Sequence, residues 1–145
     1  MVSVRTFRVD DLRKVMKIAD ESLKEIYDEE LFLTLHSAWN TGFYVAVKDN
    51  AVIGFICGTI IPTEQARLLM LAVHPLYRRQ GVGSTLMSVF VEKCIIEEVK
   101  IIVLEVRPTN HVAINFYLRR NFNPVETLED FYTNGETAIK MVKHL

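Results

Sequence analysis

Residues 71–84 read LAVHPLYRRQGVGS, and this stretch decides the fold that we expect. An apolar, strand-like run ends at His74-Pro75, a basic turn follows, and two glycines open the next segment. After Gly83, apolar residues recur at helical spacing. The first N–H groups of a helix have no partners within it, and glycine lets the backbone approach a bulky anion. The segment therefore predicts a strand, a turn and a helix start that together bind a phosphate or pyrophosphate group.

Two better-known phosphate-binding loops do not fit this segment. The Walker loop needs a lysine after its last glycine, whereas Gly83 is followed by Ser84 and Thr85. The dinucleotide-binding fingerprint needs a third glycine, and Leu86 occupies that position. A glycine-rich turn that only starts a helix remains the structural alternative.

The segments on both sides of the turn indicate an α/β (α+β) fold with a mixed sheet. Alternating or β-rich runs predict strands at residues 3–7, 43–47, 52–61, 66–73, 100–106, 126–131 and 138–142. Helical spacing predicts helices that begin at Asp10 or Asp11, at residue 28, after Gly83 and at residue 111. Asp49-Asn50 between two of the strands is typical of a hairpin turn. Antiparallel strands come first and a crossover strand–helix–strand unit follows, which predicts one mixed sheet.

Length, charge and cysteine content restrict the class of protein. The 145 residues fit a single domain, residues 1–145. With 17 basic and 18 acidic residues the net charge is -1, so we expect neither a nucleic-acid nor a membrane partner. The N-terminal residues lack the charged-then-apolar order of a signal peptide, and Cys57 and Cys94 lie in apolar runs. These features predict buried thiols in a cytoplasmic protein. The histidines show no ligand spacing with either cysteine, which predicts no metal.

The pattern Arg78-x-x-Gly81-x-Gly83 resembles the acetyl-CoA signature of the GCN5-related N-acetyltransferases, the GNAT family. The resemblance continues through Leu104-Glu105-Val106-Arg107, Asn110, Ala113-Ile114-x-Phe116-Tyr117 and Asn121-Phe122. In this form the sequence is similar to the ribosomal-protein alanine acetyltransferase branch and its archaeal N-terminal acetyltransferase relatives, over essentially the whole chain. The resemblance implies a mixed, mostly antiparallel sheet of about seven strands flanked by about four helices.

The resemblance also implies that acetyl-CoA is the acetyl donor. In the family, the strand edge that ends in Leu71, Ala72 and Val73 binds the pantetheine arm, because an unpaired edge can take an extended ligand. The implied cofactor-binding residues are Leu71, Ala72, Val73, Arg78, Arg79, Gln80, Gly81, Val82, Gly83, Ser84, Asn110 and Tyr117. The two arginines could instead be solvated, and Asn110 could act as the N-cap of the helix after it, in place of or besides the cofactor contact.

Two residues carry the implied catalytic roles. Glu105 interrupts the apolar run 101–106, and an acid there costs free energy unless it is solvated or partnered, which suggests a cleft. The structural alternative is a salt bridge at the strand end, with Arg107 as a candidate partner. The resemblance makes Glu105 the general base for an α-amine, whose pKa is about 8. It makes Tyr117 the acid that protonates the departing CoA thiolate, and the alternative is a core aromatic residue.

Two short segments resemble the substrate loops of N-terminal acetyltransferases. Leu23-x-Glu25-x-Tyr27 matches one loop, and Phe131-Tyr132 matches the aromatic pair over the peptide. The implied substrate residues are Glu25, Tyr27 and Tyr132. The sequence departs from the family pattern where Asn121 replaces a glycine, which is tolerable because asparagine accepts left-handed geometry. It departs again where Phe131 replaces a tyrosine, which removes one hydroxyl from the pair.

Together these features predict a protein N-terminal α-amine acetyltransferase that transfers the acetyl group directly from acetyl-CoA. The substrate would be a protein or peptide N-terminus, for example that of a ribosomal protein, and the enzyme would be a monomer or homodimer. One alternative keeps the chemistry and changes the acceptor to a small amine or a lysine side chain. A second alternative is a non-catalytic acyl-CoA-binding module.

Overall fold

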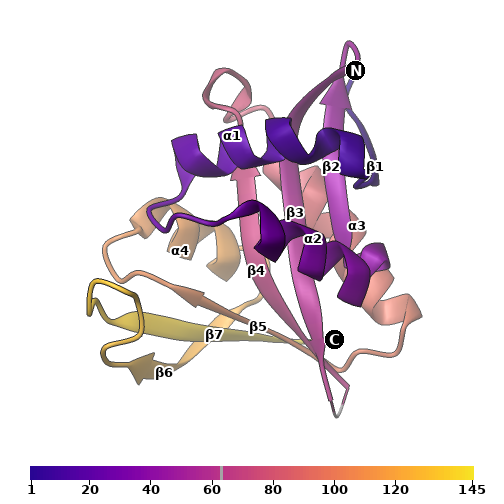
Figure 1. The fold of residues 1–145 in the computed structure, drawn as a ribbon. Coiled ribbons are helices and arrows are strands. Elements are labelled where there is room, and N and C mark those ends of the chain that lie inside the picture. The colour runs from indigo at the N-terminus through magenta and orange to yellow at the C-terminus, as the bar shows by residue number, and fades with distance from the viewer. Residues whose placement is uncertain (63) are drawn as a thin grey trace.

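The computed structural model describes residues 1–62 and 64–145, and these residues form a mixed sheet with helices on both faces (Figure 1). The seven strands are β1 Ser3–Thr6, β2 Phe43–Lys48, β3 Ala51–Ile61, β4 Gln65–Val73, β5 Ile101–Val106, β6 Asn123–Leu128 and β7 Ala138–His144. The α-helices are α1 Leu12–Ser22, α2 Glu29–Ala38, α3 Val82–Ile96 and α4 His111–Leu118. Single 3₁₀ turns are η1 Val9–Asp11, η2 Asn40–Gly42 and η3 Pro75–Tyr77. The predicted fold class is confirmed.

The strand order is β1-β2-β3-β4-β5-β7-β6. Within the described residues, β4 and β5 form the only parallel pair, and the other neighbours are antiparallel. The predicted hairpin between β2 and β3 is present: Asp49 and Asn50 have φ values of 50° and 64°, as a two-residue turn of this type requires.

One predicted strand is displaced. The run 126–131 is predicted to be extended, but β6 covers Asn123–Leu128, three residues earlier. Asn121 takes a left-handed φ of 66°, and Phe122 is fully buried, so the chain leaves α4 and enters the strand at once. The pair Phe131-Tyr132 therefore lies in the β6–β7 loop.

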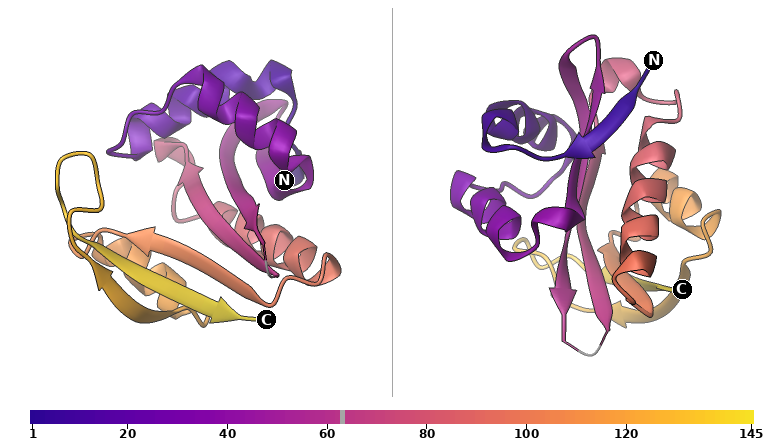
Figure 2. Two further views of the ribbon diagram at one scale, coloured as in Figure 1. Left: turned by 60° about the horizontal axis from the view of Figure 1, so that its bottom comes forward. Right: turned by 90° about the vertical axis from the view of Figure 1, so that its right-hand side faces the viewer.

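Two apolar clusters hold the helices against the sheet. Helices α1 and α2 cover one face, and α3 and α4 cover the other (Figure 2). Phe32, Phe43 and Phe55 are fully buried in the cluster under α1 and α2. Leu86 and Phe90 of α3 belong to the second cluster, together with alternate residues of β5. Each such side chain stabilises the fold by about 1.5–3 kcal/mol through its removal from water.

The pairing of β3 with β4 contains a register shift and, beside it, a close approach of the two backbones. The β3–β4 register shifts between Cys57, which faces Met70, and Gly58, which faces Leu68, so Leu69 is an extra residue in β4. A Cβ at Gly58 would lie 2.6 Å from the carbonyl oxygen of Arg67, which makes glycine necessary there.

Strands β4 and β5 pair over only three residues each. The ladder joins 65–67 to 101–103, and beyond it the two strands diverge (Figure 1). Apart from the extra residue Leu69, residues 68–73 of β4 remain paired with β3 on one side and have no partner in β5 on the other. This unpaired edge of β4 leads directly into the turn before α3.

Candidate active site

The turn between β4 and α3 presents a group of free backbone donors. Arg79 and Gly81 have φ values of 62° and 80°, and Gly81 is the N-cap of α3. The first hydrogen bond of the helix runs from the N–H of Thr85 to the carbonyl of Gly81, at 3.0 Å. Among the described residues, none accepts a hydrogen bond from the backbone N–H groups of 79–84. Such a cluster at a helix N-terminus suits an anionic ligand.

The two glycines of this turn, Gly81 and Gly83, differ in whether the fold itself requires a glycine. Gly81 needs its left-handed conformation. A Cβ at Gly83, by contrast, would meet the Phe116 ring at 3.6 Å and Val73 at 3.9 Å, which is ordinary van der Waals contact. The fold therefore has room for a Cβ at position 83.

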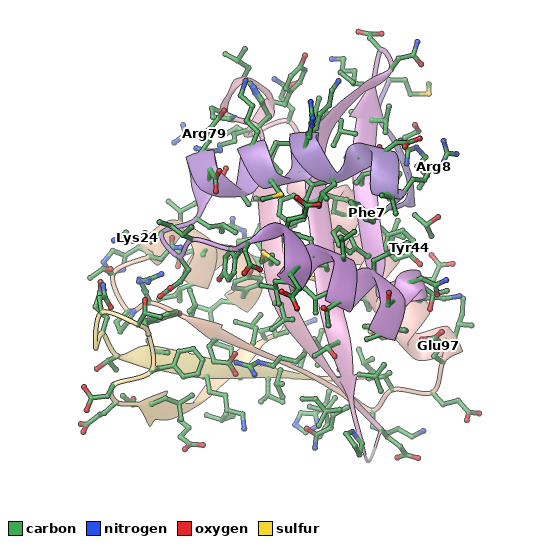
Figure 3. The ribbon with its side chains drawn as sticks, in the orientation of Figure 1. Phe7, Arg8, Lys24, Tyr44, Arg79 and Glu97 are labelled. Carbon is green, nitrogen blue, oxygen red and sulfur yellow. The ribbon has the colours of Figure 1, made fainter. Side chains whose placement is uncertain are left out.

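The predicted arginines of the turn behave differently from each other. Arg78 is not simply solvated: its Nε donates to the carbonyl of Val73 at 3.0 Å and its Nη2 donates to Ser22 Oγ at 2.9 Å. It thus fastens the turn to β4 and to the end of α1. Arg79 is exposed, at the end of α3 opposite to Glu97 (Figure 3).

Arg120 is a residue of this region that the sequence analysis missed. Its guanidinium donates to Ser84 Oγ and to the carbonyl of Phe116, and it lies 3.6 Å from the centre of the Phe116 ring. Partial burial lowers the pKa of Arg120, and the charge of Arg119 lowers it further. No sequence pattern marked this contact, because it joins the ends of two helices.

Glu105 is nearly buried, with 11% of its side chain exposed, and it has a charged partner. The partner is Arg67 of β4, not Arg107 as the sequence suggested. Nε and Nη2 of Arg67 lie 2.9 Å and 2.7 Å from Glu105 Oε1. Arg67 was not foreseen, because its strand reads as an ordinary apolar run with one cation.

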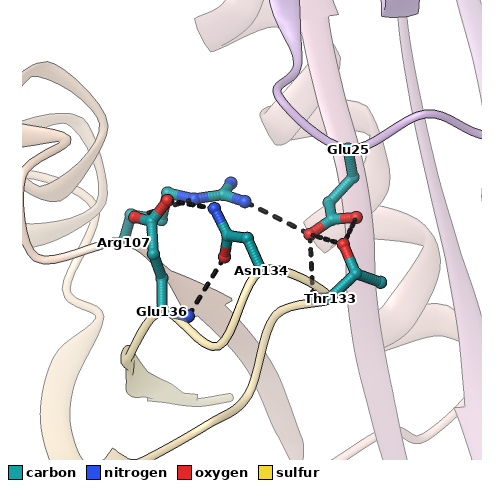
Figure 4. Close-up of polar contacts among 5 residues, drawn as sticks. All are labelled: Glu25, Arg107, Thr133, Asn134 and Glu136. Carbon is teal, nitrogen blue, oxygen red and sulfur yellow. Dashed lines mark hydrogen bonds and ion pairs between the residues drawn. The ribbon is translucent and has the colours of Figure 1, made fainter.

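Arg107 instead joins the two predicted substrate loops. Its Nη2 donates to Glu25 Oε1 at 3.2 Å, and its Nε lies 3.5 Å from Glu136 Oε2. Glu25 also accepts from the Thr133 hydroxyl at 2.9 Å, which ties the α1–α2 loop to the β6–β7 loop (Figure 4). The guanidinium of Arg107 stacks on the Tyr132 ring, 3.8 Å from its centre.

The three predicted tyrosines are partly buried, and desolvation raises the pKa of each phenol. For Tyr27 the charge of Glu25 adds to this effect. Arg107 lowers the pKa of Tyr132, and Glu105 raises it. The pKa of Tyr117 is raised to about 12, with a contribution from Tyr132.

Direct contacts connect several of the predicted catalytic and substrate residues. The guanidinium of Arg67, which binds Glu105, lies 5.9 Å from the centre of the Phe131 ring, and Phe131 packs edge-on against Tyr132 with ring centres 5.0 Å apart. Tyr132 in turn stacks on Arg107, which binds Glu25.

Two residues of α4 also have structural roles. Asn110 is the N-cap of the helix, because its Oδ1 accepts from the N–H of Ala113 at 3.2 Å. Tyr117 packs edge-on against Phe116 and Phe122, with ring centres 5.5 Å apart in both pairs. Neither contact uses the Asn110 amide nitrogen or the Tyr117 hydroxyl, the group to which the resemblance assigns proton transfer.

Other features concern metals, thiols and membranes. Outside residue 63, no three His, Cys, Asp or Glu side chains gather as a metal site, and no helix has the length and apolar character needed to cross a bilayer. Cys57 and Cys94 are free and buried, and desolvation raises the pKa of both thiols, that of Cys94 to about 12.

Comparison with known proteins agrees with this architecture. Residues 9–122 match the model of the acetyltransferase (GNAT) family. The chain is 30% identical over 155 residues to an N-alpha-acetyltransferase of Saccharolobus solfataricus, covering 99% of this chain and 93% of the relative. The structure of Ard1 from Thermoplasma volcanium superimposes with a TM-score of 0.96 at 35% identity, covering 99% of this chain and 97% of that one.

A third similarity is to the ribosomal-protein-S18-alanine N-acetyltransferase from Escherichia coli. Its structure superimposes with a TM-score of 0.86 at 25% identity and covers 99% of this chain and 94% of that one. The family match spans most of the chain, and these alignments extend over nearly all of it. The chain therefore belongs to the GNAT family of acetyltransferases.

Proposed function

We propose that this protein transfers an acetyl group from acetyl-CoA to the N-terminal α-amine of a protein or peptide. The observation that carries the proposal is the position of Glu105. Arg67 holds its carboxylate at the point where β4 and β5 diverge, and the Phe131 ring covers Arg67. Phe131 packs against Tyr132, and both belong to one of the two loops that Arg107 ties together. A proton acceptor therefore lies beside the loops that would hold a peptide.

Acetyl-CoA fits the residues of the β4–α3 turn. The free N–H groups of 79–84 would hold the pyrophosphate, and the Ser84 hydroxyl and the Asn110 amide would add contacts. The unpaired edge of β4 at Leu71, Ala72 and Val73 would bind the pantetheine arm. The cofactor supplies an acetyl thioester, whose carbonyl is open to attack by an amine.

Two residues of the chain, Glu105 and Tyr117, accept and donate the protons of the reaction. Glu105 accepts the proton that the acceptor amine loses, directly or through a water molecule. Tyr117 is protonated at neutral pH, since its pKa is raised to about 12, so it acts as the donor toward the departing sulfur. A thiol has a pKa of about 8.5, so the thiolate is already a good leaving group, and a donated hydrogen bond is sufficient help.

A protein N-terminus is the acceptor that the relatives favour. Similar proteins are an N-alpha-acetyltransferase and an acetyltransferase of ribosomal protein S18 alanine. For this chain we propose a protein substrate, with ribosomal proteins as the first candidates. The free, buried thiols suit a reducing compartment, so we place the reaction in the cytoplasm.

A peptide panel tests the acceptor. One set has a free N-terminus and no lysine, and the matched set is blocked at the N-terminus and carries one lysine. CoA release and the mass of the products are measured. We expect acetylation of the first set and poor turnover of the second. Equal rates on both sets would favour the lysine alternative, and binding of acetyl-CoA without turnover of any amine would favour a binding module.

A further inference from the structure

Arg67 occupies a particular position in the sheet. It is the last residue of β4 in the ladder with β5, opposite Val103, and the strands diverge after it. Ala66 and Leu68 lie in the apolar cluster with α3, as do Leu104 and Val106. Because side chains alternate along a strand, Arg67 and Glu105 both lie on the opposite face of the sheet.

The contact between the two residues is one-sided. Both Arg67 nitrogens, Nε and Nη2, approach the same oxygen of Glu105, Oε1. The other oxygen, Oε2, accepts no hydrogen bond from the described residues. A carboxylate held in this way is fixed in orientation, and one of its oxygens stays available for another donor.

Among the described residues, Arg67 is the cation that reaches the Glu105 carboxylate. Lys140 lies opposite Glu105 in β7 and forms no ion pair with it. Arg107, the other arginine on this face, is engaged by Glu25 and Glu136. Arg67 is covered on one side by the Phe131 ring, whose centre lies 5.9 Å from the guanidinium carbon. A phenylalanine at position 131 provides an aromatic face there without adding a hydroxyl that could compete for the guanidinium.

We infer that Arg67 is a positioning residue for the acetyl transfer, which holds Oε1 of Glu105 and reserves Oε2 for the proton of the acceptor amine. The inference rests on the proposed role of Glu105 as the base. The proton passes from the amine nitrogen to Oε2 and then to solvent, while Arg67 keeps its own protons and charge throughout. Arg67 therefore acts through Glu105 and needs no contact with substrate.

A double-mutant cycle tests this inference. The variants are Arg67→Met, Glu105→Gln and the double variant, with kcat and both KM values measured on one peptide. We expect Arg67→Met to lower kcat by about tenfold to a hundredfold, since misplacing a catalytic group by about 1 Å can cost about 10²-fold. Both KM values should change by less than about threefold. In the Glu105→Gln background, Arg67→Met should cost less than about twofold in kcat.

Arg5 provides the matched control, because it forms a similar two-nitrogen ion pair with Asp11 at 2.8 and 2.9 Å, away from the site. Its side chain is 32% exposed, close to the 35% of Arg67. Arg5→Met should lower the melting temperature but leave kcat unchanged. Arg67→Lys should recover part of the kcat lost in Arg67→Met, and it keeps the test usable if the methionine variant folds poorly.

The outcomes separate this inference from the proposed function. A loss in Arg67→Met that is equally large in both backgrounds would overturn the positioning role. So would parental kcat in Arg67→Met beside a slow Glu105→Gln, although the base assignment would then stand. Parental activity of Glu105→Gln would overturn the base assignment, and the positioning role with it.

Discussion

The turn between β4 and α3 differs in chemistry from the loop network, which consists of Glu25, Arg107, Tyr132, Thr133 and Glu136. The turn consists of consecutive backbone N–H groups without partners in the described chain. The network consists of side chains that bind one another, from Glu25 to Thr133. The Nε of Arg107 is buried there and lies 3.5 Å from Glu136 Oε2 without a hydrogen bond to any described residue. A ligand can meet the first region without breaking any protein contact, whereas a peptide must compete with existing ion pairs and hydrogen bonds in the second. In the function proposed above, the cofactor end is therefore preformed, and the acceptor end has to exchange partners.

The largest expected effect concerns Glu105, on the acceptor side of this comparison. Glu105→Gln keeps the shape but removes the proton acceptor, so kcat/KM should fall by about 10²–10⁴-fold near neutral pH. Part of the loss should be recovered at alkaline pH, because the substrate amine, with a pKa of about 8, then loses its proton unaided. The measurement is the pH–rate profile on one peptide.

Two controls accompany that variant. Acetyl-CoA affinity should be unchanged, and Glu126→Gln, at an exposed position of β6, should have parental activity. A Glu105→Gln enzyme with parental rates across the pH range would show that another group, or solvent, takes the proton.

The second prediction concerns the cofactor end. Gly83→Val puts a branched side chain beside the free N–H groups, at a position where a Cβ meets only van der Waals contacts. Hydrogen bonds to charged groups contribute about 1.5–3 kcal/mol each, so losing one should weaken acetyl-CoA binding by roughly 10- to 100-fold. Calorimetric titration measures this affinity. Ser88→Val, at an exposed position of the same helix, is the control for helix propensity. Unchanged affinity in a folded Gly83→Val protein would contradict the site.

A smaller effect is expected from the hydrogen bond between Thr133 and Glu25, which connects the two loops. Thr133→Val removes the hydroxyl that donates this hydrogen bond to Glu25, while Arg107 still binds the Glu25 carboxylate. The KM for peptide should change by about two- to fivefold, because one exposed hydrogen bond contributes little. The KM for acetyl-CoA should stay the same, and Thr133→Ser should behave as the parent. A change in the acetyl-CoA KM instead would mean that the two ends are not independent.

The smallest expected effect is that the contribution of Tyr117 to kcat/KM does not change with pH. With a pKa raised to about 12, Tyr117 stays neutral throughout the working pH range, so its contribution to the rate should be constant. The ratio of parental to Tyr117→Phe kcat/KM should be flat from about pH 7 to about pH 10, the ordinary tyrosine pKa. A decline of that ratio with a midpoint near 10 would place Tyr117 in a more hydrated setting than the structure has.

The two regions also differ in how far they could be predicted. The turn is contiguous, so the glycines, the helix start and the free donors are all visible in residues 71–84. The acceptor network joins residues distant in sequence: Arg67 and Glu105 are 38 positions apart, and Glu25 and Arg107 are 82 apart. Local patterns identified Glu105 as an acid in need of a partner, but choosing Arg67 over Arg107 requires the register of β4 against β5.

Two local features also escaped the sequence. The extra residue at Leu69 sits within the unbroken apolar run 68–73, where nothing marks a change of face. The displacement of β6 has a similar origin. Residues 126–131 include three acids and indicate a strand only weakly, and the left-handed Asn121 and the burial of Phe122 start the strand earlier. In both cases tertiary packing outweighs intrinsic preference.

Because the ladder between β4 and β5 is short, β4 has an unpaired backbone edge like that of an outer strand, although it lies in the middle of the sheet. From Leu68 to Val73, backbone groups that face β3 are protected, and those that face β5 are open. Amide hydrogen exchange along β4 should therefore alternate between slow and fast residues, as it does in an edge strand. An open row of donors and acceptors is also a template on which another chain can add as a strand.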